Sequence, residues 1–154
     1  VYRLGLVTGL LDRDDAIRWA DYIIQNHEDI EYEIIEISLA EKNVDITSKL
    51  YDIKGTTDNH LVIKVFLSLS SDKFNWNKIS AGEICRILYD LIWSNCIIHV
   101  DDDIAYKVSL LDDYYSLITE RMINNDIEYL YKELKEFLDE YSKYINLLSV
   151  NINN

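Results

Sequence analysis

The run Asp101-Asp102-Asp103 is the densest group of side chains that could bind a metal ion. A calcium loop of the EF-hand type needs acids at alternate positions, a glycine at the sixth position and a bidentate glutamate at the twelfth. Counted from Asp101, the sixth residue is Tyr106 and the twelfth is Asp112, so the turn-forming glycine is missing. Acidic side chains are stabilising at the N-terminus of a helix. The run therefore predicts the start of a helix and no metal site.

A second set of carboxylates has helical spacing near the end of the chain. Glu133, Glu136 and Asp139 follow one another at three-residue steps, and Glu33 with Glu36 could form a second pair. Magnesium is usually held by one or two carboxylates together with substrate phosphates and water. The three acids flank the apolar stripe of an amphipathic segment, however, where solvated acids are expected. We expect an exposed helix face, and a magnesium-dependent helical nucleotide pyrophosphohydrolase is the enzymatic alternative.

Histidines and known catalytic patterns give no support to an active site. His27, His60 and His99 lie far apart in the sequence, and none has a second histidine or a cysteine at ligand spacing. The patterns GxSxG, GxGxxG and HExxH and the Walker loop do not occur. The sequence therefore predicts a protein that is not an enzyme, with no cofactor, no catalytic residues and no metal site.

The charge of the chain is strongly negative and unevenly distributed. The net charge is −13; residues 1–45 carry 11 acids and 4 bases (−7), residues 46–100 carry 5 and 6 (+1), and residues 101–154 carry 12 and 5 (−7). Such a field repels nucleic acids and anionic membranes and steers cationic partners toward the protein. A nucleic-acid-binding protein would need a clustered basic face, which is missing from the sequence. We expect a basic protein as the partner.

Two acidic groups and one tryptophan are the expected contacts with that partner. Trp76 lies in the polar segment KFNWNK, where an exposed aromatic side chain could anchor a partner or fold back on the core. Trp19 and Trp93 lie in apolar periodic stretches and are expected in the core. The acidic contacts are Asp12, Asp14 and Asp15 near the start, and Asp101, Asp102, Asp103, Asp112 and Asp113.

The elements that must position these residues are expected to be helices. The 154 residues are enough for one domain, and no proline interrupts them. Apolar residues recur at three- and four-residue steps in 14–26, 80–94, 102–123 and 126–148, and a shorter stripe runs through 45–53. Ser80 and Glu83 have the spacing of a capping box. We expect one all-α domain over residues 1–154, with about six or seven helices in antiparallel pairs.

Three segments leave their secondary structure open. LGLVTGLL, before Asp12, fits either a short helix ending at Gly9 or a buried lead-in. Residues 30–41 fit a helix, but residues 33–39 also alternate as a strand would; residues 61–70 have the same ambiguity. We favour helices, because an isolated pair of strands would be marginally stable in water.

The last two long segments are expected to pair as a helical hairpin. Only the short link NND separates residues 102–123 from residues 126–148, and short links favour antiparallel neighbours. The polar residues at 148–154 are expected to fray.

Cysteine content and hydropathy indicate a cytoplasmic protein. Cys85 and Cys96 are expected to be reduced, and Cys85 falls among apolar helical positions. No run of 18 apolar residues could span a membrane, and no signal peptide is visible. The sequence begins at Val1, so a processed start fits it as well as a native one.

The opening LGLVTGLLDRDDAIRWADYII, residues 4–24, resembles the start of a group of small uncharacterised bacterial proteins. In size, acidity and lack of catalytic residues the chain is also similar to immunity proteins, which neutralise a co-encoded bacterial toxin by binding it. The resemblance implies a non-enzymatic protein-binding domain that neutralises a cationic toxin. An intracellular adaptor or dimerisation domain is the other non-enzymatic alternative.

Overall fold

A computed structural model describes residues 1–75, 79–93, 100–121 and 127–148. These residues form helices and no strands, which confirms the all-α prediction for the described part of the chain. They group into two compact units, which we describe one at a time. The first comprises Val1–Thr57 and the end of the chain from Asn146, and the second comprises Asp58–Ile145. The expectation of a single domain stays a prediction.

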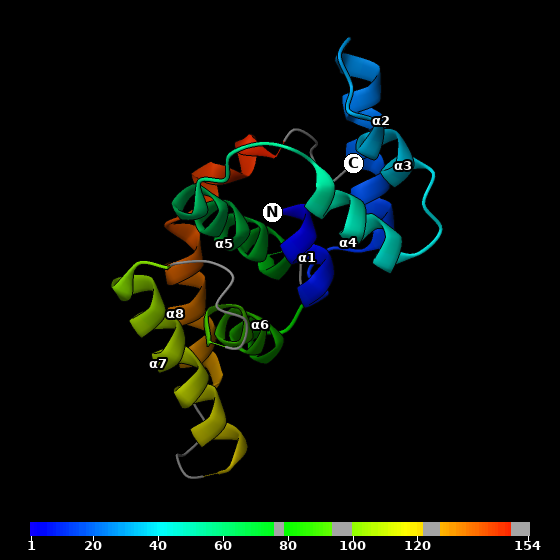
Figure 1. Ribbon diagram of the computed structural model, residues 1–154. Coiled ribbons are helices and arrows are strands. Elements are labelled where there is room, and N and C mark those ends of the chain that lie inside the picture. Colours follow the sequence, from blue (N-terminus) through cyan, green and yellow to red (C-terminus); the bar gives the residue numbers. More distant parts are fainter. Residues whose placement is uncertain (76–78, 94–99, 122–126, 149–154) are drawn as a thin grey trace. The chain divides into compact units, whose positions relative to one another are not determined.

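The first unit contains four helices (Figure 1). They are α1 (Tyr2–Thr8), α2 (Arg13–Asn26), α3 (Tyr32–Ser38) and α4 (Asn43–Asp52). Helix α3 contacts both α2 and α4, and α1 contacts α4. The segment LGLVTGLL, for which the sequence left a short helix and a buried lead-in as alternatives, contributes to helix α1. It ends at Gly9, whose φ of 77° places it in the left-handed region that glycine adopts without steric cost.

The second unit begins with α5 (Asn59–Asn75), which resolves the ambiguity of residues 61–70 in favour of a helix. Its residues Val65 to Ser71 are all buried, so the helix is enclosed on all sides along two turns. A helix that is buried all round has no single apolar stripe. The sequence of this segment therefore lacks the single apolar stripe by which a helix is told from a strand. Two of its buried hydroxyls donate to main-chain carbonyl oxygens, Ser70 to Phe66 and Ser68 to Ser142.

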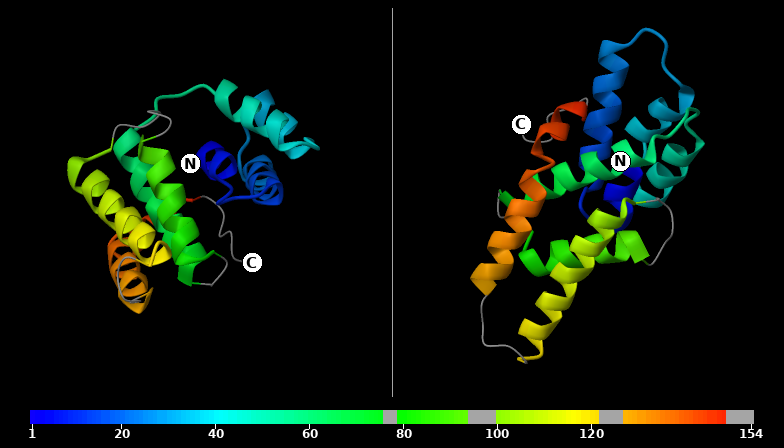
Figure 2. Two further views of the ribbon diagram at one scale, coloured as in Figure 1. Left: turned by 90° about the horizontal axis from the view of Figure 1, so that it is seen from below. Right: turned by 90° about the vertical axis from the view of Figure 1, so that its left-hand side faces the viewer.

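The remaining helices of this unit are α6 (Ala81–Trp93), α7 (Asp102–Thr119) and α8 (Ile127–Asp139). The 3-10 helix η1 (Ser142–Leu147) follows, and the boundary of the two units falls within it, after Ile145. Helix α6 contacts α7 and α8, α7 contacts α8, and α5 contacts α8. Figure 2 shows α7 and α8 running in opposite directions. The predicted capping box before α6 is present: the Glu83 carboxylate accepts from the Ser80 amide at 2.9 Å, and the Ser80 hydroxyl accepts from the Glu83 amide at 3.3 Å.

The expectation of one uninterrupted helix over residues 126–148 is wrong. Helix α8 ends at Asp139, and the chain continues as η1 with i→i+3 hydrogen bonds, from the Tyr141 amide to Leu138 and from the Tyr144 amide to Tyr141. The Ser142 hydroxyl donates to the carbonyl oxygen of Asp139 at 2.8 Å. Such side-chain bonds to the backbone compete with helical ones and favour turns. This break and the separate helix α1 raise the number of helices in the described residues above the expected six or seven.

Three further expectations concern the cysteines, the end of the chain and membrane-spanning segments. Cys85 is a buried free thiol, and burial raises its pKa to about 12, while Cys96 lies outside the described residues. Of the tail expected to fray, only Leu148 is described, and it is buried. Among the described residues, no helix is long and apolar enough to cross a membrane.

Candidate protein-binding face of helix α7

Helix α7 is apolar on two of its sides. Its inner stripe includes Ile104, Val108, Leu111 and Ile118, which are all buried. A second stripe points to solvent at steps of three and four residues. We call this stripe the α7 outward face; it consists of Asp103, Tyr106, Leu110, Asp113, Leu117 and the C-cap residue Glu120.

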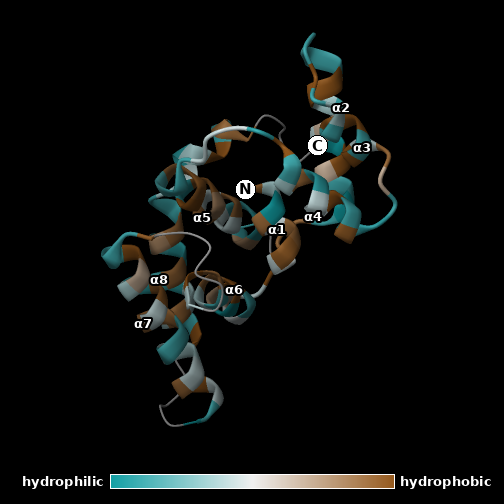
Figure 3. Ribbon diagram, in the orientation of Figure 1, coloured by the Kyte–Doolittle hydropathy of each residue, from teal (hydrophilic) through white to brown (hydrophobic). Residues whose placement is uncertain are grey.

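Large apolar side chains on the α7 outward face are well exposed. Tyr106 is 70% exposed, Leu110 is 48% exposed and Leu117 is 38% exposed. At a rise of about 1.5 Å per residue, the stripe from Asp103 to Leu117 extends along roughly 21 Å of the helix. Figure 3 shows hydrophilic and hydrophobic stretches along the ribbon of α7. Three carboxylates and three apolar side chains thus share one exposed helix face.

An indole group from α6 lies beside this face. The Trp93 Nε1–H donates to the Ser109 hydroxyl at 3.1 Å, and the ring of Tyr89 lies 6.4 Å from the Trp93 ring, centroid to centroid. Trp93 is 53% exposed, so the expectation that it belongs to the core is wrong. It follows the buried Leu91 by two residues, which is about 200° around a helix, and so points away from the buried side of α6. The apolar periodicity of the sequence did not show that Leu91 faces the core and Trp93 faces solvent.

The other tryptophans differ from each other. Trp19 is half-buried and stacks on Tyr2, with 4.8 Å between the ring centroids. Trp76, the expected anchor for a partner, lies outside the described residues.

The first acidic group, Asp12, Asp14 and Asp15, mainly serves the start of α2. The Asp12 carboxylate accepts from the Asp15 amide at 2.9 Å, and the Asp15 carboxylate accepts from the Asp12 amide at 3.1 Å. Asp15 is only 3% exposed and forms an ion pair with Arg18 at 2.5 Å. Asp12 and Asp14 are both exposed, and Asp14 pairs with its neighbour Arg13 at 3.2 Å. Asp12 and Asp15 therefore act as a capping box, and Asp14 is the exposed acid of this group that takes no part in the cap.

The second acidic group is divided between the surface and the interior. Asp101 is the N-cap residue of α7 and pairs with His60 of α5 at 3.1 Å. Asp102 and Asp103 are exposed in the first turn, as expected for acids at a helix N-terminus. Asp113 is exposed. These acids gather at the start and along the outer side of α7.

Asp112 does not share this exposed position. It is buried, and its Oδ1 has no hydrogen-bond partner among the described residues. The nearest positive charge is Arg86, whose Nε lies 4.0 Å from that oxygen. Burial raises the pKa of Asp112 above its ordinary value, although Arg86 acts in the opposite direction. Asp112 is therefore not part of the α7 outward face.

The carboxylates with helical spacing on α8 are each paired with a lysine. Glu133 lies 2.8 Å from Lys107, and its hydrogen bond with that lysine lowers the pKa of the carboxyl group. Glu136 lies 3.8 Å from Lys132. On α3, Glu36 pairs with Lys49 of α4 at 2.7 Å. No group of three or more His, Cys, Asp or Glu side chains in the described parts of the chain could hold a metal ion.

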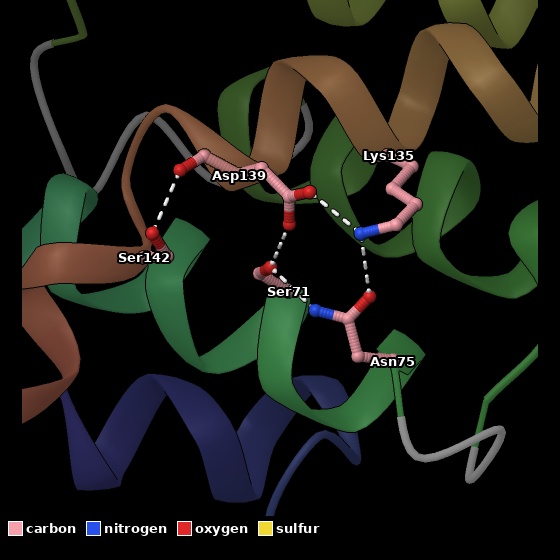
Figure 4. Close-up of polar contacts among 5 residues, drawn as sticks. All are labelled: Ser71, Asn75, Lys135, Asp139 and Ser142. Carbon is pink, nitrogen blue, oxygen red and sulfur yellow. Dashed lines mark hydrogen bonds and ion pairs between the residues drawn. The ribbon is translucent and has the colours of Figure 1, made fainter.

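The third of these carboxylates, Asp139, joins α8 to α5 (Figure 4). It accepts hydrogen bonds from Lys135 at 2.6 Å and from the Ser71 hydroxyl at 3.0 Å. Asn75 donates to Ser71 at 3.3 Å and accepts from Lys135 at 3.1 Å. Burial acts to raise the pKa of Asp139, but these hydrogen bonds outweigh it and hold the pKa below its ordinary value. A serine, a lysine and a carboxylate thus meet here in a closed polar network that stabilises the packing of two helices.

Sequence reasoning missed the apolar members of the α7 outward face. Their signal was present: Tyr106, Leu110 and Leu117 are large apolar residues of the segment 102–123 that do not belong to its inner stripe. Comparison with known proteins adds no assignment. No protein-family model matches the chain, and no curated protein or solved structure matches it either.

Proposed function

We propose that the chain is a non-enzymatic protein-binding domain that captures a basic protein on the α7 outward face. The observation that carries the proposal is that the exposed apolar side chains of this face lie beside exposed acids; they are Tyr106, Leu110 and Leu117, with Asp103 and Asp113. Aromatic and aliphatic anchors supply most of the affinity of protein interfaces, whereas complementary charges speed association and exclude wrong partners. A cationic bacterial toxin is the partner implied by the similarity to immunity proteins.

The charges on this face favour a basic partner over a second copy of the same chain. In a parallel pairing of two α7 helices, each acid would face its own copy. In an antiparallel pairing centred on Leu111 and Asp112, Asp103 would face Glu120. Like charges at such close range are destabilising. The repulsion between these acids disfavours a dimer formed through the α7 outward face.

On α8, Glu133, Glu136 and Asp139 are each paired with a lysine, which argues against the pyrophosphohydrolase alternative. A magnesium site would have to displace these lysines first. The residues that would bind the partner are those of the α7 outward face, with Trp93 and Asp102 at further exposed positions of the same unit.

The test is affinity capture of a partner from the native host at low salt, followed by quantitative binding to the purified partner. We expect a basic protein encoded beside this chain, bound with an association rate that falls as salt is added. The variant Tyr106→Ala/Leu110→Asp should weaken binding at least tenfold. The matched control is Tyr32→Ala/Leu39→Asp on the other unit, because Tyr32 and Leu39 are 69% and 76% exposed.

Two results would overturn the proposal. One is a partner whose binding is weakened equally by the control variant and by the α7 variant. The other is the absence of any basic protein among the captured proteins at low salt. Mass measurement of the purified chain tests the dimer separately, and a dimer disrupted by Tyr106→Ala/Leu110→Asp would favour the alternative.

A further inference from the structure

A groove between α1 and α4 in the first unit has a lining unlike the rest of the protein. Its volume is about 530 Å³, within the range of roughly 300–1,000 Å³ typical of small-molecule sites. Three side chains come from α1 and five from α4, and none of them is acidic. This composition is unusual in a chain with 28 acidic and 15 basic residues.

The floor and walls of the groove are mainly apolar. Leu6 is buried at 8% exposure, whereas Val7, Val44 and Tyr51 are exposed at 56%, 77% and 74%. The neighbouring helices α1 and α4 contact each other, as Figure 1 also shows. The acids of α4 do not line the groove. An apolar body that filled the groove would remove this exposed surface from water.

The groove contains one positively charged side chain, Arg3, and its lining includes no carboxylate. Arg3 lies over the ring of Tyr51, with 5.5 Å from the guanidinium carbon to the ring centroid, and it is half-buried. Within the described residues, no carboxylate lies at ion-pair distance from Arg3, whereas Arg13, Arg18 and Arg86 each have one. A guanidinium stays charged at all ordinary pH values and binds carboxylates in a bidentate manner.

We propose that this groove binds a small apolar carboxylate, such as an aryl or branched alkyl carboxylic acid. The carboxylate would pair with Arg3, and the apolar body would lie against Leu6, Val7 and Val44. The Asn43 amide and the Ser48 hydroxyl also line the groove and could donate a second hydrogen bond to the ligand, whereas the Thr47 hydroxyl already donates to the carbonyl oxygen of Asn43 at 2.8 Å. This inference goes beyond the proposed function, since it concerns other helices and another class of ligand.

The probe for the test is 4-phenylbutyrate, titrated into the full chain and followed by two-dimensional NMR of the backbone amides. We expect saturable shifts confined to residues of α1 and α4. The neutral analogue 4-phenylbutan-1-ol and the cationic analogue 4-phenylbutylamine should bind at least tenfold more weakly, because they cannot form the ion pair with Arg3.

Two variants and two matched controls separate the groove from the rest of the surface. Arg3→Gln should weaken binding of 4-phenylbutyrate about tenfold, and Val44→Asp should abolish the shifts. Arg13→Gln removes an arginine of the same unit, and Leu39→Asp alters a side chain as exposed as Val44 (76% and 77%); both should leave binding unchanged. Circular dichroism checks that all four variants are folded.

The inference is overturned if 4-phenylbutyrate causes no saturable shifts, or if the alcohol and the carboxylate bind equally well. It is also overturned if Arg13→Gln weakens binding as much as Arg3→Gln, since the carboxylate would then respond to net charge only. A peptide with an apolar free C-terminus that binds while 4-phenylbutyrate does not would likewise contradict a small-molecule site.

Discussion

Asp112 and Asp113 are neighbours in the sequence but lie in opposite environments. Asp113 is exposed on the α7 outward face, whereas Asp112 is buried with an Oδ1 that lacks a hydrogen bond among the described residues. Consecutive residues of a helix point about 100° apart, so one of two adjacent acids can serve a surface while the other is forced inward. The buried acid lowers the stability of the fold, and the exposed acid is available to a partner.

Replacing the buried acid should stabilise the protein. Because the folded state raises the pKa of Asp112, ionisation of this group opposes folding, and the cost is fully present above the folded pKa. It disappears as the pH falls below the ordinary value of 3.8 for the unfolded chain. Asp112→Asn should therefore raise the free energy of unfolding at pH 7 by about 1 kcal/mol, the size expected for an unsatisfied buried group.

Urea unfolding at pH 7 and at pH 3.5 measures this effect. The gain from Asp112→Asn should shrink at the lower pH. Asp113→Asn is the control and should change stability by less than about 0.5 kcal/mol, as surface substitutions usually do. Loss of stability in Asp112→Asn at pH 7 would mean that the contact with Arg86 outweighs burial.

The capping box of α2 gives a second prediction. Asp12→Ala should lower the free energy of unfolding by about 1 kcal/mol, because the amide of Asp15 loses its acceptor. Asp12→Asn keeps an acceptor and should retain most of the stability. Thermal unfolding compares these variants with Asp14→Ala, which removes the same charge but no capping hydrogen bond, since Asp14 makes only an exposed contact with Arg13. The comparison distinguishes loss of the cap from a change in net charge. Equal losses from Asp12→Ala and Asp14→Ala would contradict the capping role.

The helical content of the fold was predictable from apolar periodicity, because most helices bury a single stripe. Residues 14–26, 80–94 and 102–123 match α2, α6 and α7 to within a few residues at each end. The end of α8 was not predictable in this way. Neither proline nor glycine marks the break at Asp139, and the turn depends on the Ser142 hydroxyl reaching one backbone carbonyl.

The candidate site was predictable only in part, because exposure depends on neighbouring helices. Acidic residues were expected at the surface, and Asp103 and Asp113 lie there. Asp15 and Asp112 are buried by packing that no local pattern reports. The sequence does show that Tyr106 and Leu110 lie outside the inner stripe, but it does not show whether a neighbouring helix covers them.

The close contact between α6 and α7 gives a third prediction. A Cβ added to Gly82 would overlap the ring of Tyr115, so either that ring or one of the two helices would have to shift. Gly82→Ala should destabilise the fold by about 1–3 kcal/mol despite the better helix propensity of alanine. The double variant Gly82→Ala/Tyr115→Ala should be more stable than the sum of the single effects, since removing the ring makes room for the methyl group. Additive losses in urea unfolding would contradict this contact.

The network of Ser71, Asn75, Lys135 and Asp139 gives the last prediction, which concerns pH (Figure 4). The folded state lowers the pKa of Asp139, so its ionised form stabilises the fold, and this contribution is complete above the ordinary pKa of 3.8. It is lost as the pH falls through the lower, folded-state pKa. Ser71→Ala and Asp139→Asn should each cost about 0.5–1 kcal/mol at pH 7, since the Asp139 carboxylate is partly exposed and solvent screens its interactions.

A double-mutant cycle between these two positions tests whether they act together. We expect a coupling energy of at least about 0.5 kcal/mol at pH 7, because Ser71→Ala removes the donor of this bond, and Asp139→Asn leaves only a weaker, uncharged acceptor for the Ser71 hydroxyl. The difference between the wild-type chain and Asp139→Asn should decrease as the pH is lowered from 6 toward 2.5. Glu140→Gln is the control, since Glu140 is the exposed neighbour of Asp139. If the cycle shows no coupling and the cost of Asp139→Asn does not change with pH, α5 and α8 are held together by apolar packing alone, and the polar network only follows from that packing.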